Sequence, residues 1–194
     1  KAGVHLIATG QADFCYLTLT DYMQHKFAPE HPESLEFYRG IDHEIGRLLE
    51  MDCIVAATAD HGMNAKCDAE GNPNVVYLET ELQKEFGDGI TVICPITDPY
   101  VVHHGALGSA VTVYLPEAAD ASEIANWILN IDGVAEVHQR DTAVSKLELP
   151  SDRIGDLFVL ATRDYVIGRT PAHHDLSQLA GQLRSHGGRY EEMV

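Results

Sequence analysis

An amphipathic helix pattern between two short apolar runs most constrains how this chain can fold. From Glu33 to Met51 the apolar residues recur every three or four positions, which places them on one helical face just after Pro32. The flanking runs, residues 13–20 and 53–58, are short and apolar, and the first is rich in β-branched and aromatic residues. Both patterns are typical of buried strands. Strand, helix and strand in this order predict a βαβ unit, which belongs to a parallel sheet covered by helices.

The rest of the chain continues this pattern. Further strands are predicted at residues 90–94, 109–115, 134–139 and 156–161, and a helix at 120–131 begins with an Asp120–Glu123 capping box. We therefore predict an α/β fold with a mainly parallel sheet flanked by helices. Residues 106–150 are predicted to form a small α/β cap insert, and residues 1–105 together with 151–194 the core.

The charge balance limits the partners of this chain. Its 194 residues carry 13 basic and 30 acidic side chains, a formal charge of −17, and no basic run exceeds two residues. Attraction to a nucleic-acid backbone or an anionic membrane is therefore not expected. Its cysteines are far apart and lack any C-x-x-C spacing, which predicts reduced thiols and a cytoplasmic protein. No apolar stretch approaches the roughly 18 residues that span a bilayer.

Polar clusters directly follow both apolar runs. Asp21 and His25 come after the first run at a four-residue spacing, which on a helix turns both side chains the same way. Asp60, His61 and Gly62 come after the second. Because ligands of open α/β sheets gather beyond the carboxyl ends of parallel strands, we expect both clusters on one rim. Carboxylate and imidazole donors without thiolate suit zinc or a similar ion in a catalytic site.

Spacing alone leaves structural alternatives open for both clusters. Asp21 is equally suited to cap a helix on which His25 is solvated. The Asp60-His61-Gly62 segment is equally suited to form a turn after a strand.

Two longer segments around these clusters are more specific. TADHGMNAK (residues 58–66) and LTDYMQHKFAPEHPES (residues 19–34) resemble the phosphonoacetate hydrolase family of the alkaline phosphatase superfamily. The resemblance implies an alkaline-phosphatase-like core with two zinc ions. It implies that Asp21, His25 and a late histidine bind one ion, and that Asp60 and His61 supply two ligands to the other.

The late histidine is expected in a His-Gly context by the same resemblance. His186 in Ser-His-Gly-Gly fits that context, with His173 and His174 in TPAHHDL as rivals. The family also places an aspartate and a nucleophilic threonine well ahead of Asp21. Thr9 lies too close to Asp21 for that role, so the chain is expected to correspond to the C-terminal half of the family protein, with one metal site incomplete.

The resemblance implies a zinc-dependent hydrolysis of the carbon–phosphorus bond of phosphonoacetate to acetate and phosphate, through a threonine nucleophile outside this chain. This cleavage expels a carbanion equivalent that the neighbouring carboxylate must stabilise, so cations near the carboxylate are needed. Lys26, Lys66 and His104 are the candidates, and each has the alternative of being a solvated loop residue. Gly62 and Gly105 would allow close backbone approach without being ligands.

Two other functions remain open from the sequence. The first is a phosphodiesterase or nucleotide pyrophosphatase of the same superfamily, which would need an aromatic slot for a base. The second is a metal-binding fragment without activity, because the nucleophile is not in this chain. A small-molecule substrate is the expected partner, and a homodimer is compatible with the sequence.

Overall fold

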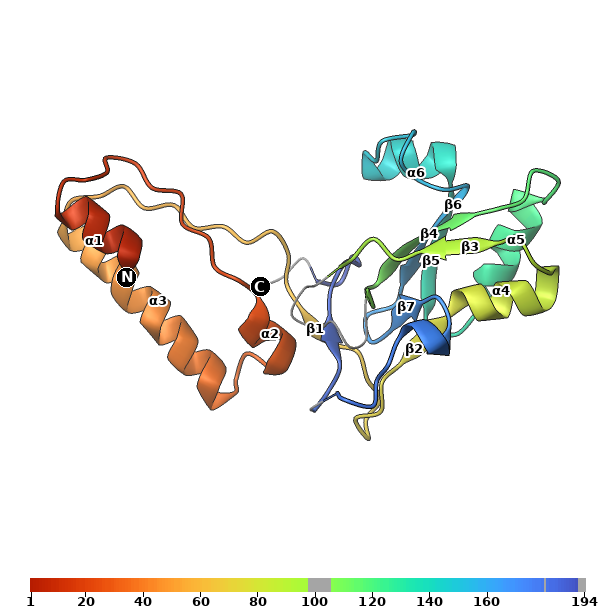
Figure 1. The fold of residues 1–194 in the computed structure, drawn as a ribbon, viewed down its shortest axis with the longest axis horizontal. Helices are drawn as coiled ribbons and strands as arrows, with labels where there is room; N and C mark the ends of the chain where they lie inside the picture. The colour runs from red at the N-terminus through yellow and green to blue at the C-terminus, as the bar shows by residue number, and fades with distance from the viewer. Residues whose placement is uncertain (98–105, 180, 192–194) are drawn as a thin grey trace. The chain divides into compact units, whose positions relative to one another are not determined.

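The computed structural model describes residues 1–97, 106–179 and 181–191, which form two compact units, Lys1–Asp60 and His61–Val194. Figure 1 follows the chain through both units. Within the described residues, no helix is long and apolar enough to cross a membrane. The four cysteines are free thiols. The cytoplasmic location of the protein stays a prediction.

The first unit is helical. It contains α1 (Ala2–Ala8), α2 (Tyr22–Lys26) and α3 (Pro32–Glu50). Both α1 and α2 lie against α3, and the side-chain amide of Gln24 donates a 3.0 Å hydrogen bond to the Tyr38 hydroxyl across the α2–α3 contact. The long helix confirms the pattern read from residues 33–51, and Pro32 occupies its first turn, where a missing N–H costs nothing.

The two strands predicted in this unit are not formed. Residues 13–20 and 53–58 make no sheet ladder, so the prediction of a βαβ unit is wrong for the described structure. A strand exists only through hydrogen bonds to a neighbour, and the first unit supplies none. Phe14 is consequently 86% exposed and Ile54 is fully exposed. These segments have the composition of buried strands in an environment that does not bury them.

The second unit is built on strands. Its elements are β1 (Asn64–Ala65), β2 (Val75–Tyr77), α4 (Leu78–Phe86), β3 (Thr91–Ile93), β4 (Ala110–Tyr114), α5 (Ala121–Ile128), β5 (Val134–Gln139), α6 (Arg140–Leu147), β6 (Leu157–Ala161), β7 (Val166–Gly168), a 3-10 turn (Pro171–His173) and β8 (Arg184–Ser185). The largest sheet has the order β3-β4-β6-β5 and is antiparallel throughout. β2 pairs with β7 in parallel, and β1 pairs with β8 antiparallel.

α4 and α5 lie beside the four-stranded sheet (Figure 1), and their apolar side chains form a hydrophobic core with those of the strands. Alternate residues such as Val92, Val111 and Val159 point toward α4 and α5. Leu82 and Ile128 fill the space between these helices and the sheet, and both are fully buried. The sheet and its two helices thus share one core, and β1 and β8 lie outside the four-stranded sheet.

Most local predictions for this unit are confirmed. β3, β4, β5 and β6 lie where strands were expected, and Asp120 caps α5 by accepting from the amides of Ser122 and Glu123 at 2.8 and 3.1 Å. The α/β class is confirmed as well. The expected mainly parallel direction is not found among the described strands: the β3–β4, β4–β6 and β5–β6 ladders are antiparallel, and the parallel pair is β2 with β7.

The predicted domain boundaries stay a prediction. Residues 106–150 contribute β4, α5, β5 and α6, and both β4 and β5 pair with β6 from beyond residue 150. These residues therefore share one sheet with the segment that follows them.

Candidate metal site

The first candidate pair lies at the start of α2. Asp21 occupies the position before the helix, and His25 lies one turn later with its ring largely buried. Their side chains approach each other, with His25 Nε2 3.3 Å from Asp21 Oδ2. The four-residue spacing therefore does place a carboxylate and an imidazole together, as predicted.

This separation suits a shared ion. Two donors held about 2.0–2.2 Å from a tetrahedral zinc lie about 3.3–3.6 Å apart. Oδ2 of Asp21 and Nε2 of His25 have that spacing. The pair fits two ligand positions of a zinc ion by both chemistry and distance.

The second candidate pair lies in the other unit. The imidazole rings of His61 and His186 are stacked, with centroids 3.7 Å apart and planes 5° from parallel. The β1–β8 ladder explains how residues so far apart in sequence meet: Asn64 pairs with Ser185 and Ala65 with Arg184. His61 precedes β1 by three residues and His186 directly follows β8, so one short ladder places both rings.

The backbone around His61 selects its tautomer. His61 Nδ1 lies 2.9 Å from the carbonyl oxygen of Gly62, which can only accept a hydrogen bond. The proton therefore resides on Nδ1, and the lone pair is on Nε2. A histidine whose other nitrogen donates to a backbone carbonyl is typical of metal ligands. Asp60, the residue before His61, is exposed at the end of the first unit.

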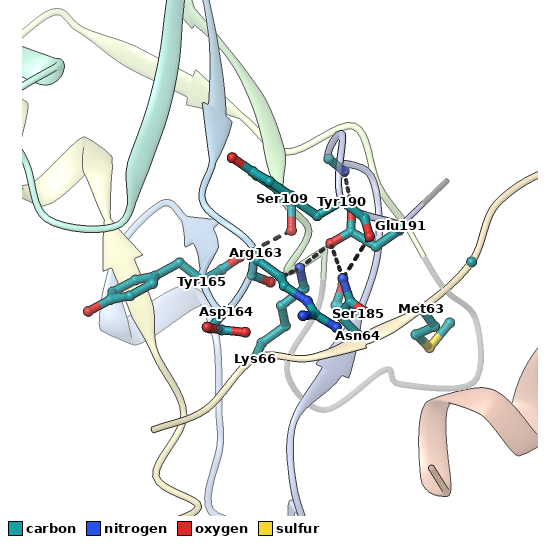
Figure 2. A network of polar contacts seen from close by, with 12 residues as sticks. Met63, Asn64, Lys66, Ser109, Arg163, Asp164, Tyr165, Ser185, Tyr190 and Glu191 are labelled. Carbon is teal, nitrogen blue, oxygen red and sulfur yellow. Dashed lines mark hydrogen bonds and ion pairs between the residues drawn. The ribbon is translucent and has the colours of Figure 1, made fainter. Parts of the chain in front are cut away.

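The second unit also contains a buried ion pair, formed by Lys66 and Glu191. In the sequence Lys66 follows His61, and Glu191 follows His186. Figure 2 shows the ammonium of Lys66 against the carboxylate of Glu191, with Asn64, Ser109 and Arg163 around them. Lys66 is completely buried and also donates a 2.7 Å hydrogen bond to the carbonyl of Arg163. Burial lowers the pKa of Lys66, while the hydrogen bond from its ammonium to Glu191 opposes that effect.

This placement corrects one prediction. Lys66 was expected to be a cation for the carboxylate of the substrate, but its ammonium is enclosed and bound to Glu191 and a backbone carbonyl. Sequence reasoning missed Glu191, which has no motif around it and lies 125 residues from Lys66.

The other substrate-binding candidates have different outcomes. Lys26 is exposed at the end of α2, with its ammonium 4.7 Å from the centre of the Tyr22 ring, a cation–π contact. It remains available to an anion. His104 and Gly105 lie outside the described residues.

The rivals of His186 have separate surroundings. His174 is buried, and its Nε2 accepts a 2.9 Å hydrogen bond from the backbone N–H of Arg169. His173 is exposed and pairs with the Thr170 hydroxyl through Nδ1 at 2.8 Å. Of the three late histidines, His186 is the one whose ring is stacked on His61, so the geometry favours it.

An α/β fold with aspartate and histidine clusters is compatible with several classes of protein, and comparison with known proteins gives the class. The chain belongs to the type I phosphodiesterase / nucleotide pyrophosphatase family, because the sequence model of that family matches residues 11–189. This family lies within the alkaline phosphatase superfamily, in agreement with the sequence resemblance.

Within this class the chain is similar to one particular enzyme. It is 46% identical to phosphonoacetate hydrolase from Sinorhizobium meliloti 1021, whose structures were solved in complex with phosphonoformate and with phosphonoacetate. The TM-score is 0.91 in both cases, and the match covers 98% of this chain. The chain spans 46% of the length of that protein.

More distant solved structures share the fold. Murine ectonucleotide pyrophosphatase / phosphodiesterase 5 is 16% identical with a TM-score of 0.57, over 97% of this chain and 47% of that protein. An inactive form of the same murine protein with AMP is 14% identical with a TM-score of 0.53, over 88% of this chain and 41% of that one. At these identities the likeness concerns the fold alone.

Proposed function

We propose that this chain carries most of the metal ligands of a zinc-dependent hydrolase that cleaves the carbon–phosphorus bond of phosphonoacetate to acetate and phosphate. The observation that carries the proposal is the 46% identity to phosphonoacetate hydrolase over 98% of the chain. The local geometry of two ligand pairs supports it. Asp21 and His25 have the spacing of ligands to one ion, and His61 and His186 are held side by side.

The ligand assignment follows the family order. Asp21, His25 and His186 would hold one zinc ion, and Asp60 and His61 would give two ligands to a second. When bound, the two ions would activate the nucleophile and hold the phosphoryl oxygens. The remaining ligand and the nucleophilic threonine are expected from a segment that the family places before Asp21.

The charge of the chain shapes what its own residues must do. Phosphonoacetate carries up to three negative charges, and the formal charge of the chain is −17. Local cations must therefore outweigh the overall repulsion. Lys26 directly follows the proposed ligand His25 in the sequence, and its ammonium is exposed. Among the described residues it is therefore our candidate for binding the substrate carboxylate. His104 remains a second candidate for the same role.

The test is a phosphate-release assay with phosphonoacetate on a longer form of the protein that includes the segment expected before Asp21. Release should stop after chelation and return with zinc. Activity that persists after exhaustive chelation would contradict the metal-dependent mechanism.

A phosphodiesterase or nucleotide pyrophosphatase activity is the second candidate, because the family carries that description. A nitrophenyl ester of a nucleoside 5′-phosphate distinguishes the two. Preferred cleavage of this ester over phosphonoacetate would support the second candidate and overturn the first.

A further inference from the structure

The buried ion pair between Lys66 and Glu191 demands a reason beyond stability. Lys66 is 0% and Glu191 2% exposed. Taking both charges out of water costs several kcal/mol for each ion, and well-packed apolar residues often fill such a place at least as well. What this pair holds in position therefore matters more than its own contribution to the free energy of unfolding.

Glu191 bonds to the backbone beside both stacked histidines. Its Oε2 accepts a 2.8 Å hydrogen bond from the amide of Gly188, two residues after His186. Its main-chain carbonyl accepts from the amide of Gly62, the residue after His61. One residue thus fixes the loops that carry both rings.

Lys66 and its neighbours hold Glu191 in that place. The Lys66 ammonium binds Glu191 Oε1 and the carbonyl of Arg163, which ties the carboxylate to the segment before β7. Asn64 Nδ2 lies 3.0 Å from the carbonyl of Tyr190 and 3.4 Å from Glu191 Oε1. Figure 2 shows these contacts converging on the carboxylate.

The loop after His186 packs tightly against Ser109 and Glu191. A Cβ on Gly188 would lie 2.9 Å from both Glu191 Oε2 and Ser109 Cβ. The carbonyl of His186 itself accepts a 2.8 Å hydrogen bond from the Ser109 amide. The His186 loop is therefore clamped between the start of β4 and the carboxylate of Glu191.

We propose that Lys66 and Glu191 are positioning residues for the metal-ligating imidazoles of His61 and His186. The inference rests on the proposed function of these histidines. Neither residue is assigned as a metal ligand; the pair acts by fixing the backbone at Gly62 and Gly188. Positioning of this kind contributes about 10- to 100-fold to metal affinity in known sites.

The test compares Glu191→Gln with Glu79→Gln in the whole chain. Glu79 is a matched control, because it is a buried carboxylate of the same unit that binds the Arg169 guanidinium and the Val92 amide. In each variant the Gln amide nitrogen replaces an oxygen that accepts from a donor, so each variant loses at least one hydrogen bond. Zinc affinity is measured by competition with a chromogenic chelator, and the melting temperature is recorded in parallel.

We expect Glu191→Gln to weaken zinc binding by about tenfold or more, and Glu79→Gln to keep it within about twofold while lowering the melting temperature comparably. The visible spectrum of the Co²⁺-loaded chain should change in Glu191→Gln and not in the control. Equal zinc affinity in both variants would overturn the inference and leave the proposed function standing. A parent chain that binds no zinc would overturn both.

A second variant covers a failure of Glu191→Gln to fold. The double change Lys66→Met with Glu191→Leu replaces both charges by apolar groups, which commonly preserves folding. It should retain a melting temperature near that of the parent chain and still bind zinc about tenfold more weakly. Parent-like zinc affinity in the folded double variant would equally overturn the inference.

Discussion

The imidazole rings of His61 and His186 lie face to face, 3.7 Å apart and within 5° of parallel. Stacked rings keep their nitrogens in two parallel planes, so each ring can bind an ion of its own. The 3.7 Å between the ring centroids is close to the roughly 3.5–4 Å that separates the ions of two-metal sites. The stack is therefore compatible with one imidazole for each of the two proposed zinc ions.

The first prediction concerns His61 in the longer, active form of the protein. His61→Ala should lower the rate of phosphate release from phosphonoacetate by several orders of magnitude, because it removes a proposed zinc ligand. His173→Ala is the matched control, since His173 is an exposed late histidine outside the stack, and it should leave the rate within about twofold. A rate for His61→Ala close to that of the control would contradict the ligand assignment.

The second prediction concerns Lys26. Lys26→Ala should raise KM for phosphonoacetate about tenfold, the scale of one lost charge-assisted contact, while Lys26→Arg should recover part of the loss. Lys84→Ala on α4 is the control, because Lys84 is likewise exposed near the end of a helix. An unchanged KM in Lys26→Ala would remove Lys26 from the binding site.

The elements that could be predicted from the sequence are those with local patterns. α3 and α5 show regular apolar spacing and begin with Pro32 and Asp120, and β4 to β6 are short apolar runs that pair with one another. α4 was overlooked although Leu78 and Leu82, both fully buried, have helical spacing. α4 begins directly after β2 and has no side-chain cap, so the sequence carries no capping residue that marks its start.

What the sequence could not supply depends on distant partners. Residues 13–20 and 53–58 have the composition of strands, but a segment becomes a strand only when a neighbouring strand pairs with it through backbone hydrogen bonds. His61 meets His186 through the β1–β8 ladder, a pairing of two residues on each side that no periodicity reveals. Lys66 resembles a substrate ligand in TADHGMNAK, and only the fold shows that Glu191 binds it. The ligand motifs were visible, while the residues that support them were not.

The third prediction concerns the exposed apolar segments of the first unit. Phe14, Tyr16 and Leu19 are each more than half exposed, and Ile54 is fully exposed. Surfaces of this kind bind the dye ANS, because apolar patches of this extent are rare on folded monomers. The 194-residue chain should therefore raise ANS fluorescence.

Substitution tests the source of that signal. Phe14→Ser combined with Ile54→Ser should lower the fluorescence at least about twofold, in proportion to the apolar area removed. Leu129→Ser is the control, since Leu129 is 52% exposed and lies in the other unit. Fluorescence that falls equally in the control would place the dye elsewhere.

The fourth prediction concerns the pH dependence of the Glu79–Arg169 ion pair. Burial raises the pKa of Glu79, but hydrogen bonds from Arg169 and the Val92 amide outweigh it and hold the pKa below its usual value. The unfolded chain therefore takes up a proton before the folded one as pH falls. The stabilisation by Glu79 is present above its usual pKa of about 4.3 and is lost as pH falls through the lower folded value.

Glu79→Gln should accordingly lower the free energy of unfolding by roughly 1–3 kcal/mol at pH 7. Its difference from the parent chain should shrink as pH falls below about 4. Urea unfolding at pH 7, 5 and 3.5 measures this, with Glu81→Gln, exposed on the same helix, as control. If the difference in free energy of unfolding between the two chains stays constant across these pH values, the ionised Glu79 carboxylate does not stabilise the folded state.

The last prediction concerns metal binding and turnover by the 194-residue chain alone. In the proposed assignment Asp21, His25 and His186 would supply three protein ligands, which is enough for a catalytic zinc with water in the fourth position. Asp60 and His61 would supply only two ligands to the proposed second ion, and the nucleophile is expected outside this chain. The chain should therefore retain about one zinc per molecule after dialysis and release no phosphate from phosphonoacetate.

Elemental analysis and a phosphate assay on the same sample measure both quantities. Asp21→Asn should lower the retained zinc, and the control Asp13→Asn, in the neighbouring segment, should not. Two tightly held ions, or turnover by this chain, would mean that the remaining ligands and the nucleophile lie within its own sequence.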